Sequence, residues 1–379
     1  MKFLFTCGGT AGHINPALGV ASRIRELLPD SEFLFVGAKG KMETELIPRE
    51  GYDIITVEIT NLRRGFKPDQ IVHNLKTVRN VIVSMGQAKK IIQEFHPDVA
   101  VGTGGYVCYP VLRAAHKLGV PTAIHESNAV PGLTTKLLSK LVDQIMVGFE
   151  EAKANYSCPE KVLVTGTPVR SDFRNLDKTT ARAELGIPAE KPLVVSVWGS
   201  LGATYMNRTI AEMIALAAKD PDFLLIHSAG KRGYESMRKD LAARGIENCD
   251  PLGFEVREYI YDMSRVMAAA DVVMCRSGAS TLSELTAMGK PALLIPSPNV
   301  TGNHQEKNAR VLEAAGGAKV LVEGAFTAES LLATLRALLA DPAELTAMSE
   351  NMKKTGVASA TDQIAEIVLG LAQKHADTN

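Results

Sequence analysis

The sequence predicts an α/β fold of two domains, each built on a parallel β-sheet with helices on both faces. Short β-branched apolar runs alternate with helical patterns along the chain, which is the order of elements in doubly wound folds. A length of 379 residues exceeds what one core usually holds and suits two domains. Hydrophobic residues make up 46% and aromatic residues only 5%, a composition that suits aliphatic parallel strands.

The first half alternates strands and helices after a glycine-rich loop at residues 8–12. A helix is expected from that loop to residue 28. The expected strands are residues 3–7, 32–36, 98–101, 122–124, 144–147 and 161–164. Alternation of this kind predicts parallel strands in one sheet.

The second half repeats the plan, and its expected strands are residues 193–197, 223–227, 271–274 and 292–295. The residues at 98–105 and 271–278 have the same layout, and a Gly-X-Pro follows each, at 119–121 and 289–291. We therefore expect a Rossmann-like domain over residues 1–165 and another over 166–357. The tail over 358–379 is expected to form a helix with Ile364, Ile367, Val368 and Leu371 on one face.

The charge balance and the placement of the cysteines argue against several classes of protein. Lys plus Arg equal Asp plus Glu at 42 each, which argues against a nucleic-acid binder. The five cysteines are scattered without a CxxC pair, so neither a disulfide framework nor a zinc site is expected, and a reducing cytoplasm fits. The first apolar run is too short for a signal peptide, and charges interrupt the longer ones. We expect a protein that is soluble or lies on a membrane surface.

The first glycine-rich loop, Gly-Gly-Thr-Ala-Gly-His-Ile-Asn-Pro at 8–16, follows a strand and opens a helix. Glycines allow close approach of a ligand, and a helix start attracts anions. The loop departs from the GxGxxG fingerprint and lacks the Lys-Ser/Thr of a P-loop, which disfavours a nicotinamide or ATP enzyme. His13 lies at the end of this loop. It is either available as a base or forms a structural hydrogen bond.

Two more loops of the first half follow strands: Gly-Thr-Gly-Gly-Tyr at 102–106 and His-Glu-Ser-Asn-Ala-Val-Pro-Gly at 125–132. Polar residues after a buried strand, with Pro and Gly shaping the turn, indicate a binding loop. Ordinary turn chemistry is the alternative.

The loop Arg-Ser-Gly-Ala-Ser-Thr-Leu-Ser-Glu at 276–284 is the most specific feature of the second half. Its helix start suits a pyrophosphate, and Glu284 suits two ribose hydroxyls. Alternatively, Ser280 and Glu284 cap the helix. A polar run at 299–308 follows.

A metal is not expected. The only Asp-X-Asp lies at 220–222, where it indicates a turn between a helix and a strand. If the chain is a transferase whose leaving group is a diphosphate, helix N-termini and arginine would neutralise that group without a metal or other cofactor.

Together and in this order, these motifs resemble the MurG family, the UDP-N-acetylglucosamine (UDP-GlcNAc) transferases that convert lipid I to lipid II in bacterial peptidoglycan synthesis. Further matches at 166–170, 199–203 and 303–309 extend the resemblance over nearly the whole chain. The sequence departs from common family residues at Ala11, Trp198, Leu201 and Asn303. The resemblance implies a GT-B fold, with two Rossmann-like domains facing across a cleft. It also implies that the C-terminal helix packs back on the N-terminal domain.

The resemblance further implies that the N-terminal domain takes the lipid-linked acceptor and the C-terminal domain the UDP-sugar. The reaction would be inverting, with His13 as the base and Glu126 as the reserve candidate. The implied UDP-GlcNAc-binding residues are Thr10, Ala11, Gly12, Asn128, Arg170, Ser200, Ile260, Ala279, Ser280, Thr281, Leu282, Ser283, Glu284 and Gln305.

The segment at 62–92 interleaves basic and apolar residues. It indicates either peripheral attachment to an anionic membrane or an amphipathic helix with a solvated face. The resemblance favours attachment at the cytoplasmic face of the cell membrane. The residues concerned are Arg63, Arg64, Phe66, Lys67, Ile71, Leu75, Lys76, Val78, Arg79, Ile82, Lys89, Lys90 and Ile92, with Lys136 and Lys140 in addition.

Three rival functions remain open. One is a GT-B enzyme that glycosylates a different lipid. Another is a UDP-GlcNAc 2-epimerase-like isomerase, which needs no acceptor. The third is a nucleotide-sugar sensor that releases nothing.

Overall fold

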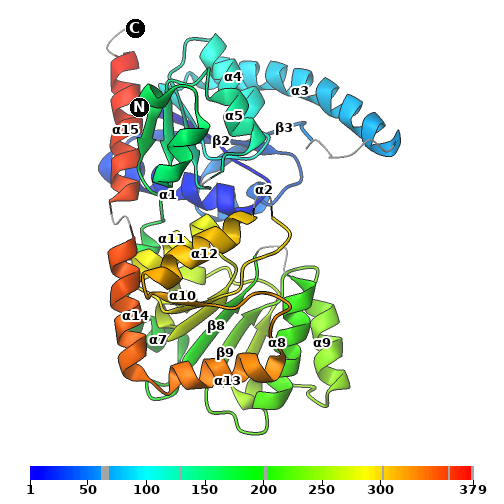
Figure 1. Cartoon of the computed structure of the whole chain (residues 1–379). Helices are drawn as coiled ribbons and strands as arrows, with labels where there is room; N and C mark the ends of the chain where they lie inside the picture. The colour runs from blue at the N-terminus through cyan, green and yellow to red at the C-terminus, as the bar shows by residue number, and fades with distance from the viewer. Residues whose placement is uncertain (61–67, 129, 200–202, 301–302, 357–358, 377–379) are drawn as a thin grey trace. The chain divides into compact units, whose positions relative to one another are not determined.

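The computed structural model describes residues 1–60, 68–128, 130–199, 203–300, 303–356 and 359–376 (Figure 1). The chain divides into two units, Met1–Ser171 with Val357–Asn379, and Asp172–Gly356. The division falls after Ser171, a few residues later than the expected boundary at 165, because residues 166–170 contact the first unit. Val169, for example, exchanges two backbone hydrogen bonds with the Thr361 hydroxyl, of 3.0 and 2.9 Å.

The first domain contains a seven-stranded parallel sheet of order β3-β2-β1-β4-β5-β6-β7. The order reverses between β1 and β4, so the loops after these two strands flank a topological switch point, where doubly wound folds bind ligands. The strands are β1 Lys2–Thr6, β2 Glu32–Ala38, β3 Asp53–Val57, β4 Val99–Gly102, β5 Thr122–Glu126, β6 Gln144–Val147 and β7 Val162–Val164.

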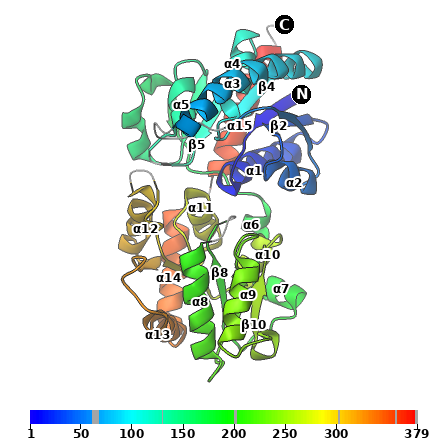
Figure 2. The same cartoon turned by 90° about the vertical axis from the view of Figure 1, so that its right-hand side faces the viewer.

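Helices cover both faces of this sheet, because successive side chains of its strands point to opposite sides. Phe3 and Phe5 pack under α1 and α15, whereas Leu4 packs under α3 and α4 (Figures 1 and 2). The helices are α1 Ala11–Leu27, α2 Glu43–Arg49, α3 Pro68–Phe95, α4 Cys108–Lys117, α5 Leu133–Leu138 and α15 Ala360–Ala376, with 3₁₀ helices η1 Glu150–Asn155 and η2 Pro159–Lys161.

The C-terminal helix α15 belongs to the first domain. Its residues Ile364 and Val368 are buried in the same cluster as the apolar residues of α1. Arg23 of α1 also forms an ion pair with Asp362 of α15, with 2.5 Å between Nε and Oδ1. The helix completes the cover over one face of the sheet.

The second domain contains a six-stranded parallel sheet of order β10-β9-β8-β11-β12-β13. The six strands have the same arrangement as β3-β2-β1-β4-β5-β6 in the sheet of the first domain. This shared arrangement accounts for the resemblance between the two halves of the sequence. Its switch point lies between β8 and β11. The strands are β8 Leu193–Val197, β9 Leu224–Ser228, β10 Phe254–Arg257, β11 Val272–Cys275, β12 Ala292–Leu294 and β13 Ala318–Val320.

The apolar core of the second domain lies between the sheet and the helices α8 and α13, with α9 beside α8 (Figure 2). The helices are α6 Asp172–Asn175, α7 Lys178–Leu185, α8 Thr204–Ala217, α9 Tyr234–Ala243, α10 Met263–Ala269, α11 Ala279–Met288, α12 His304–Ala314, α13 Ala328–Leu339 and α14 Pro342–Thr355, with η3 Asp250–Leu252.

The two Gly-X-Pro sequences occupy the same structural position. Gly119 follows α4 and leads to β5, and Gly289 follows α11 and leads to β12. Their φ angles are +77° and +64°, a left-handed conformation that glycine adopts without a Cβ clash. Each glycine therefore stops a helix and turns the chain into the next strand.

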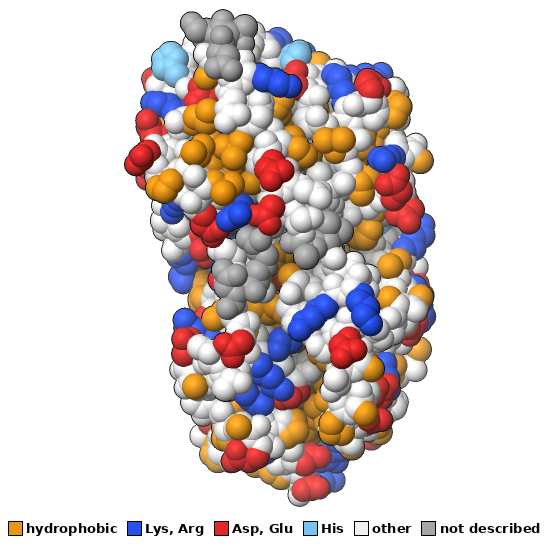
Figure 3. Space-filling model, turned by 90° about the vertical axis from the view of Figure 1, so that its left-hand side faces the viewer, with side chains coloured by type: hydrophobic (Ala, Val, Ile, Leu, Met, Phe, Trp, Pro, Cys, Tyr) orange, Lys and Arg blue, Asp and Glu red, His pale blue; other side chains and the backbone are white. Residues whose placement is uncertain are grey.

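Three strands were not expected from the sequence: β3, β10 and β13, all of them at sheet edges. No helix in the described ranges combines the length and the apolarity that a membrane crossing needs. On the face shown in Figure 3, basic and acidic side chains lie interspersed.

Candidate functional site

The glycine loops after β1 and β4 interlock at the switch point of the first domain. The Gly8 N–H donates to the Gly104 carbonyl at 3.2 Å, and the Thr103 hydroxyl donates to the His13 carbonyl at 2.6 Å. A Cβ at Gly105 would lie 2.3 Å from the Gly8 oxygen, and one at Gly104 would lie 2.4 Å from the His13 ring. Only glycine permits this contact between the two loops.

The thiol of Cys108 stabilises the base of the same two loops. Its Sγ lies 3.1 Å from the carbonyl oxygens of both Thr6 and Gly104. Burial raises the pKa of Cys108 to about 12, so the group remains a protonated donor at neutral pH. The residue therefore acts as a structural hydrogen-bonder.

The geometry of His13 assigns its tautomer. Nδ1 lies 3.0 Å from the Gly8 carbonyl oxygen and 3.4 Å from the Thr10 hydroxyl. Because a carbonyl oxygen only accepts, Nδ1 must carry the proton in the bond to Gly8. The neutral ring then has its lone pair on Nε2, which is the arrangement of a general base.

Glu126 ends β5 and organises the loop that follows. Its Oε1 accepts from the backbone and side-chain N–H groups of Asn128, at 3.1 and 2.9 Å. Its Oε2 accepts from the Gly132 N–H at 3.0 Å and from the Thr135 hydroxyl at 2.8 Å. Since a carboxylate only accepts, the Asn128 amide turns its NH₂ to Glu126 and leaves Oδ1 for another partner.

His125, which precedes Glu126, is fully buried. Its Nε2 lies 2.9 Å from the Gly166 carbonyl, and burial lowers its pKa. A neutral imidazole in this position links the β5 strand to the loop after β7. It serves the packing of the first domain.

Arg170 lies at the end of the first domain and already has a carboxylate partner. Its Nη1 is 2.5 Å from the Oε1 of Glu50, the residue that follows α2. The Arg170 side chain is mostly buried, with 15% of it exposed, whereas Glu50 is an exposed residue. A nucleotide phosphate would have to compete with Glu50 for the arginine.

The most specific loop of the second domain leads into α11. The helix begins at Ala279 with Gly278 as its N-cap, so the alternative that Ser280 and Glu284 cap the helix is wrong. Ser280, Thr281 and Ser283 are partly exposed in its first turns. Ala279, Leu282 and Glu284 are mainly buried, so Ala279 and Leu282 offer a ligand their backbone.

Gln305 and Asn308 connect α12 to the loops of neighbouring strands. Gln305 Oε1 accepts from the Ser297 N–H at 2.9 Å, which leaves the NH₂ of this amide as the group it can offer a ligand. Asn308 Nδ2 lies 3.5 Å from the Ser277 carbonyl, beside the start of α11. The residues of α12 thus lie at the carboxyl ends of β11 and β12.

Arg276 joins the ends of three strands in the second domain. It forms an ion pair with Glu323, which follows β13. Its Nη1 also donates to the carbonyls of Ile295 and Pro296 after β12, at 3.0 and 3.2 Å. Sequence reasoning did not identify Glu323, because nothing near it in the chain indicates its partner.

Ile260 and Ser200 are two further residues of the expected UDP-GlcNAc site. Ile260 follows β10 and is only 2% exposed, so a nucleobase could meet its backbone but not its side chain. Ser200 lies outside the described residues. The remaining expected residues Thr10, Ala11 and Gly12 form the exposed or half-buried start of α1.

The Asp-X-Asp at 220–222 is a turn between α8 and β9, as expected. Asp222 forms an ion pair with Arg336 at 2.9 Å, and Arg336 also donates to the Asp220 carbonyl. Among the residues that the structure describes, no three His, Cys, Asp or Glu side chains lie close enough to hold a metal ion.

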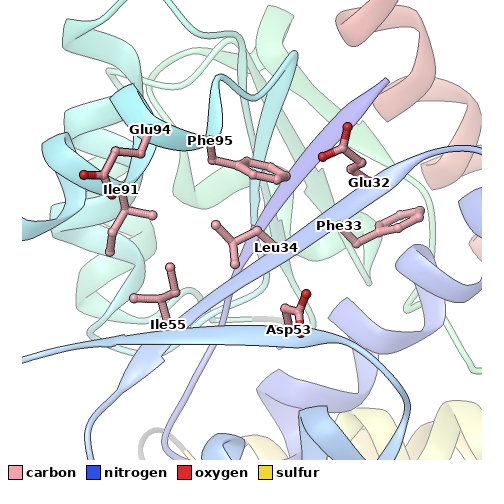
Figure 4. Close-up of a pocket in the computed structure, with 8 residues that line it drawn as sticks. All are labelled: Glu32, Phe33, Leu34, Asp53, Ile55, Ile91, Glu94 and Phe95. Atoms are coloured by element: carbon pink, nitrogen blue, oxygen red, sulfur yellow. The ribbon is translucent and has the colours of Figure 1, made fainter.

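A pocket of about 420 Å³ lies near the amino ends of strands β2 and β3 of the first sheet, beside the end of α3 (Figure 4). Its lining includes the carboxylates of Glu32, Asp53 and Glu94. These groups would repel a diphosphate. The pocket lies near the starts of β2 and β3, whereas the switch-point loops follow the carboxyl ends of β1 and β4.

Two domains, each with a doubly wound parallel sheet, are the architecture of the GT-B glycosyltransferases. Residues 3–147 match the glycosyltransferase family 28 N-terminal domain, and residues 193–364 match the C-terminal domain of the same family. The chain therefore belongs to glycosyltransferase family 28 and, within it, to the MurG family.

The relatives in sequence match nearly the whole chain. A UDP-N-acetylglucosamine--N-acetylmuramyl-(pentapeptide) pyrophosphoryl-undecaprenol N-acetylglucosamine transferase of Acetivibrio thermocellus is 42% identical over 376 residues, 99% of this chain and 100% of the relative. A protein of the same name from Listeria monocytogenes is 39% identical, over 98% of this chain and 99% of its own length.

Solved structures share the fold. MurG of Acinetobacter baumannii superposes with a TM-score of 0.68 at 24% identity, over 97% of this chain and 99% of that one. A UDP-GlcNAc 2-epimerase of Neisseria meningitidis has a TM-score of 0.64 at 16% identity, over 98% of this chain and 100% of that one. At these identities the likeness concerns the fold alone.

Proposed function

We propose that this chain transfers N-acetylglucosamine from UDP-GlcNAc to the N-acetylmuramoyl unit of lipid I and so produces lipid II. The observation that carries this proposal is the 42% identity, over 99% of the chain, to a relative named for that transfer. The epimerases share the fold at 16% identity, which does not favour their reaction.

In the proposed reaction the acceptor hydroxyl attacks the anomeric carbon of the donor sugar from the face opposite UDP. A bond forms from the acceptor oxygen to that carbon, and the bond from the carbon to the UDP oxygen breaks. The Nε2 lone pair of His13 takes the hydroxyl proton. General-base assistance of this kind contributes about 10²–10⁴-fold to a rate.

The donor contacts follow from the chemistry of the second domain. The backbone N–H groups at the start of α11, where Ala279 and Ser280 lie, suit the diphosphate, since a helix N-terminus favours negative charge. Glu284 suits the ribose hydroxyls, and the NH₂ of Gln305 suits sugar oxygens. We propose that these groups stabilise the leaving UDP without a metal ion, which turnover in excess EDTA would test.

The first domain would supply Asn128 and Arg170 to the donor. Glu126 holds the NH₂ of Asn128, so Oδ1 is the atom of this amide that can accept from a sugar O–H or N–H. Four hydrogen bonds occupy both oxygens of the Glu126 carboxylate. We therefore assign Glu126 to positioning of Asn128 and keep His13 as the base.

Peripheral attachment to the cytoplasmic face of the membrane is also part of the proposal. Leu133 and Leu137 of α5 are 61% and 53% exposed and lie beside the exposed Lys136, and Ile82 of α3 is 63% exposed. Both helices pack on α4. Apolar side chains with cations nearby suit an anionic lipid surface.

Not all of the expected basic segment contributes to this surface. Ile92 is only 3% exposed and packs in the core under α3, so its assignment to a membrane-facing patch is wrong. Residues 61–67 of the segment lie outside the described residues. Arg79, Lys89 and Lys90 are exposed on α3, where Lys90 forms an ion pair with Glu94 at 3.7 Å.

The decisive assay is UDP release from UDP-GlcNAc, with and without a soluble lipid I analogue. Acceptor-dependent release with a disaccharide product is the expected result. Release or an epimerised sugar without acceptor would contradict the proposal. His13→Ala tests the base: turnover near that of the wild type would remove His13 from this role.

A further inference from the structure

Glu43 is a fully buried carboxylate that the proposed mechanism does not use. It is the first residue of α2, and its side chain contacts the backbone of the first glycine-rich loop. Its Oε2 accepts from the Gly9 N–H at 3.0 Å, and its Oε1 accepts from the Ala38 N–H at 2.9 Å. A buried charge is costly unless hydrogen bonds compensate it, so its presence here needs a reason.

The surrounding backbone is shaped to admit this carboxylate. A Cβ at Gly8 would lie 2.3 Å from the Glu43 Oε1, and a Cβ at Gly37 would lie 2.6 Å from its Cγ. Neither glycine has a positive φ, so the absence of a side chain, and not the backbone conformation, is what these positions require. Two glycines thus make the space that Glu43 occupies.

One peptide group connects Glu43 to His13. The Gly8 carbonyl and the Gly9 N–H belong to the same peptide unit, and in a trans peptide they point in opposite directions. The N–H donates to Glu43, and the carbonyl accepts from Nδ1 of His13 at 3.0 Å. The resulting chain runs from the imidazole through the peptide to the carboxylate.

We propose that Glu43 is a positioning residue for His13, and that it acts through the peptide group between Gly8 and Gly9. The inference rests on the proposed role of His13 as the base. A negative charge at the N–H polarises the peptide and makes its carbonyl a stronger acceptor, because hydrogen bonds in a chain reinforce one another. The stronger acceptor holds the Nδ1–H tautomer and stabilises the imidazolium that forms when Nε2 takes a proton.

The proton balance is simple. Nε2 gains the acceptor proton, Nδ1 keeps its own proton throughout, and the peptide and Glu43 change neither protons nor bonds. The imidazolium later gives up the Nε2 proton to solvent. The arrangement corresponds to the histidine and carboxylate of a hydrolase triad, in which the carboxylate orients the ring and stabilises its charged form. Here a peptide group lies between the two side chains.

The test combines spectroscopy with kinetics on the full chain. With ¹⁵N-labelled histidine, the His13 resonances are identified by their loss in His13→Gln. The wild type should show a protonated Nδ1 and an unprotonated Nε2 in the neutral ring. In Glu43→Gln the Nδ1 proton should move upfield and the Nε2–H tautomer should appear. Glu45→Gln is the matched control, because Glu45 lies on the same helix and forms a surface ion pair with Arg49 at 3.3 Å.

The kinetic arm measures acceptor-dependent UDP release. Glu43→Gln should lower kcat about 10- to 100-fold, by analogy with the loss of a hydrogen-bond partner behind a metal-ligating histidine. The KM for UDP-GlcNAc should stay unchanged. In a His13→Ala background the same substitution should have no further effect on kcat, because Glu43 acts through His13.

Three results would overturn the inference. They are an Nε2–H tautomer in the wild type, an unchanged His13 spectrum in Glu43→Gln, or an equal loss of kcat with and without His13. If Glu43→Gln does not fold, Gly37→Ala replaces it, because the added methyl presses on the Glu43 side chain from β2. A wild type without transferase activity would contradict the proposed function and leave the spectroscopic test intact.

Discussion

Arg276 and Glu323 form an ion pair that links the residue after β11 to the segment after β13. Both side chains are mostly buried, and the guanidinium also lies 5.7 Å from the centre of the Trp198 ring, after β8. Arg276 also donates to the carbonyls that follow β12. The pair and its neighbours therefore connect the ends of β8, β11, β12 and β13. Arg276 lies three residues before Ala279, the first residue of α11, where we propose that the diphosphate binds.

Glu323→Gln should weaken donor binding. Without the carboxylate, Arg276 loses its charged partner and the loops around α11 become less ordered. We expect a KM for UDP-GlcNAc raised about 10-fold, since small displacements at a site are costly, and a loss of about 2 kcal/mol in the free energy of unfolding. Steady-state kinetics and chemical denaturation measure both.

The control for this substitution is Asp222→Asn in the same domain. Its ion pair with Arg336 is exposed and distant from the switch point, so it should cost less than about 1 kcal/mol and leave KM unchanged. Equal effects of the two substitutions would contradict a special role for Glu323.

Glu126→Gln should reduce kcat/KM for the donor about 100-fold, because it disturbs the hydrogen bonds that orient Asn128. Asn128→Ala should have a similar effect, and the double substitution should be no worse than Asn128→Ala alone. Thr135→Val removes only one of the four bonds and should cost less. A double variant far below both single variants would instead indicate that Glu126 has a role of its own, such as that of the base.

Replacement of Leu133 and Leu137 by serine should weaken binding to anionic vesicles at least about 10-fold, since burial of one leucine contributes about 1.5–3 kcal/mol. UDP release with a water-soluble acceptor should not change. Leu163→Ser, which alters an exposed leucine on β7, is the matched control. Co-sedimentation at low salt measures the effect, and unchanged binding of the double variant would exclude α5 from the membrane-binding surface.

Lys290 should make the second domain more stable as the pH rises above neutrality. Burial lowers its pKa to about 8, and its Nζ donates to the carbonyls of Ala268 and Ala270. Above about pH 8 the unfolded chain holds a proton that the folded chain has lost, so the free energy of unfolding increases until the unfolded lysine also titrates.

The increase attributable to Lys290 should be up to about 3 kcal/mol between pH 8 and 10.5, at about 1.4 kcal/mol for each pKa unit. Denaturation of the wild type and of Lys290→Met across this range measures it. The difference between the two curves should rise with pH and be flat below pH 7. A constant difference would show that Lys290 titrates at its usual pKa.

The interior strands were predictable because both of their faces are buried. Such strands consist of continuous apolar residues, and β6 and β8 lie at the residues that their sequences predicted. The edge strands β3, β10 and β13 were missed for the complementary reason. They have partly exposed side chains and mixed composition, as in Phe-Glu-Val-Arg of β10, and their partner strand determines that they are strands.

The loops that follow the strands were predictable as well, because a strand, glycines and a helix start are adjacent in the chain. The partners of these loops were not. Glu43 is 34 residues from Gly9, and no local pattern indicates that its carboxylate accepts from this N–H. Ile92 was expected to face a membrane, but α3 turns it into the core.

By itself the sequence determined the doubly wound domains, the positions of their interior strands along the chain and the residue types of the loops that follow them, because periodicity and glycine placement act over a few residues. The tertiary structure alone decided which polar groups meet. It assigned the Nδ1 proton of His13, the orientation of the Asn128 amide and the partners of Arg276, because hydrogen bonds depend on distances of about 3 Å between segments far apart in the chain.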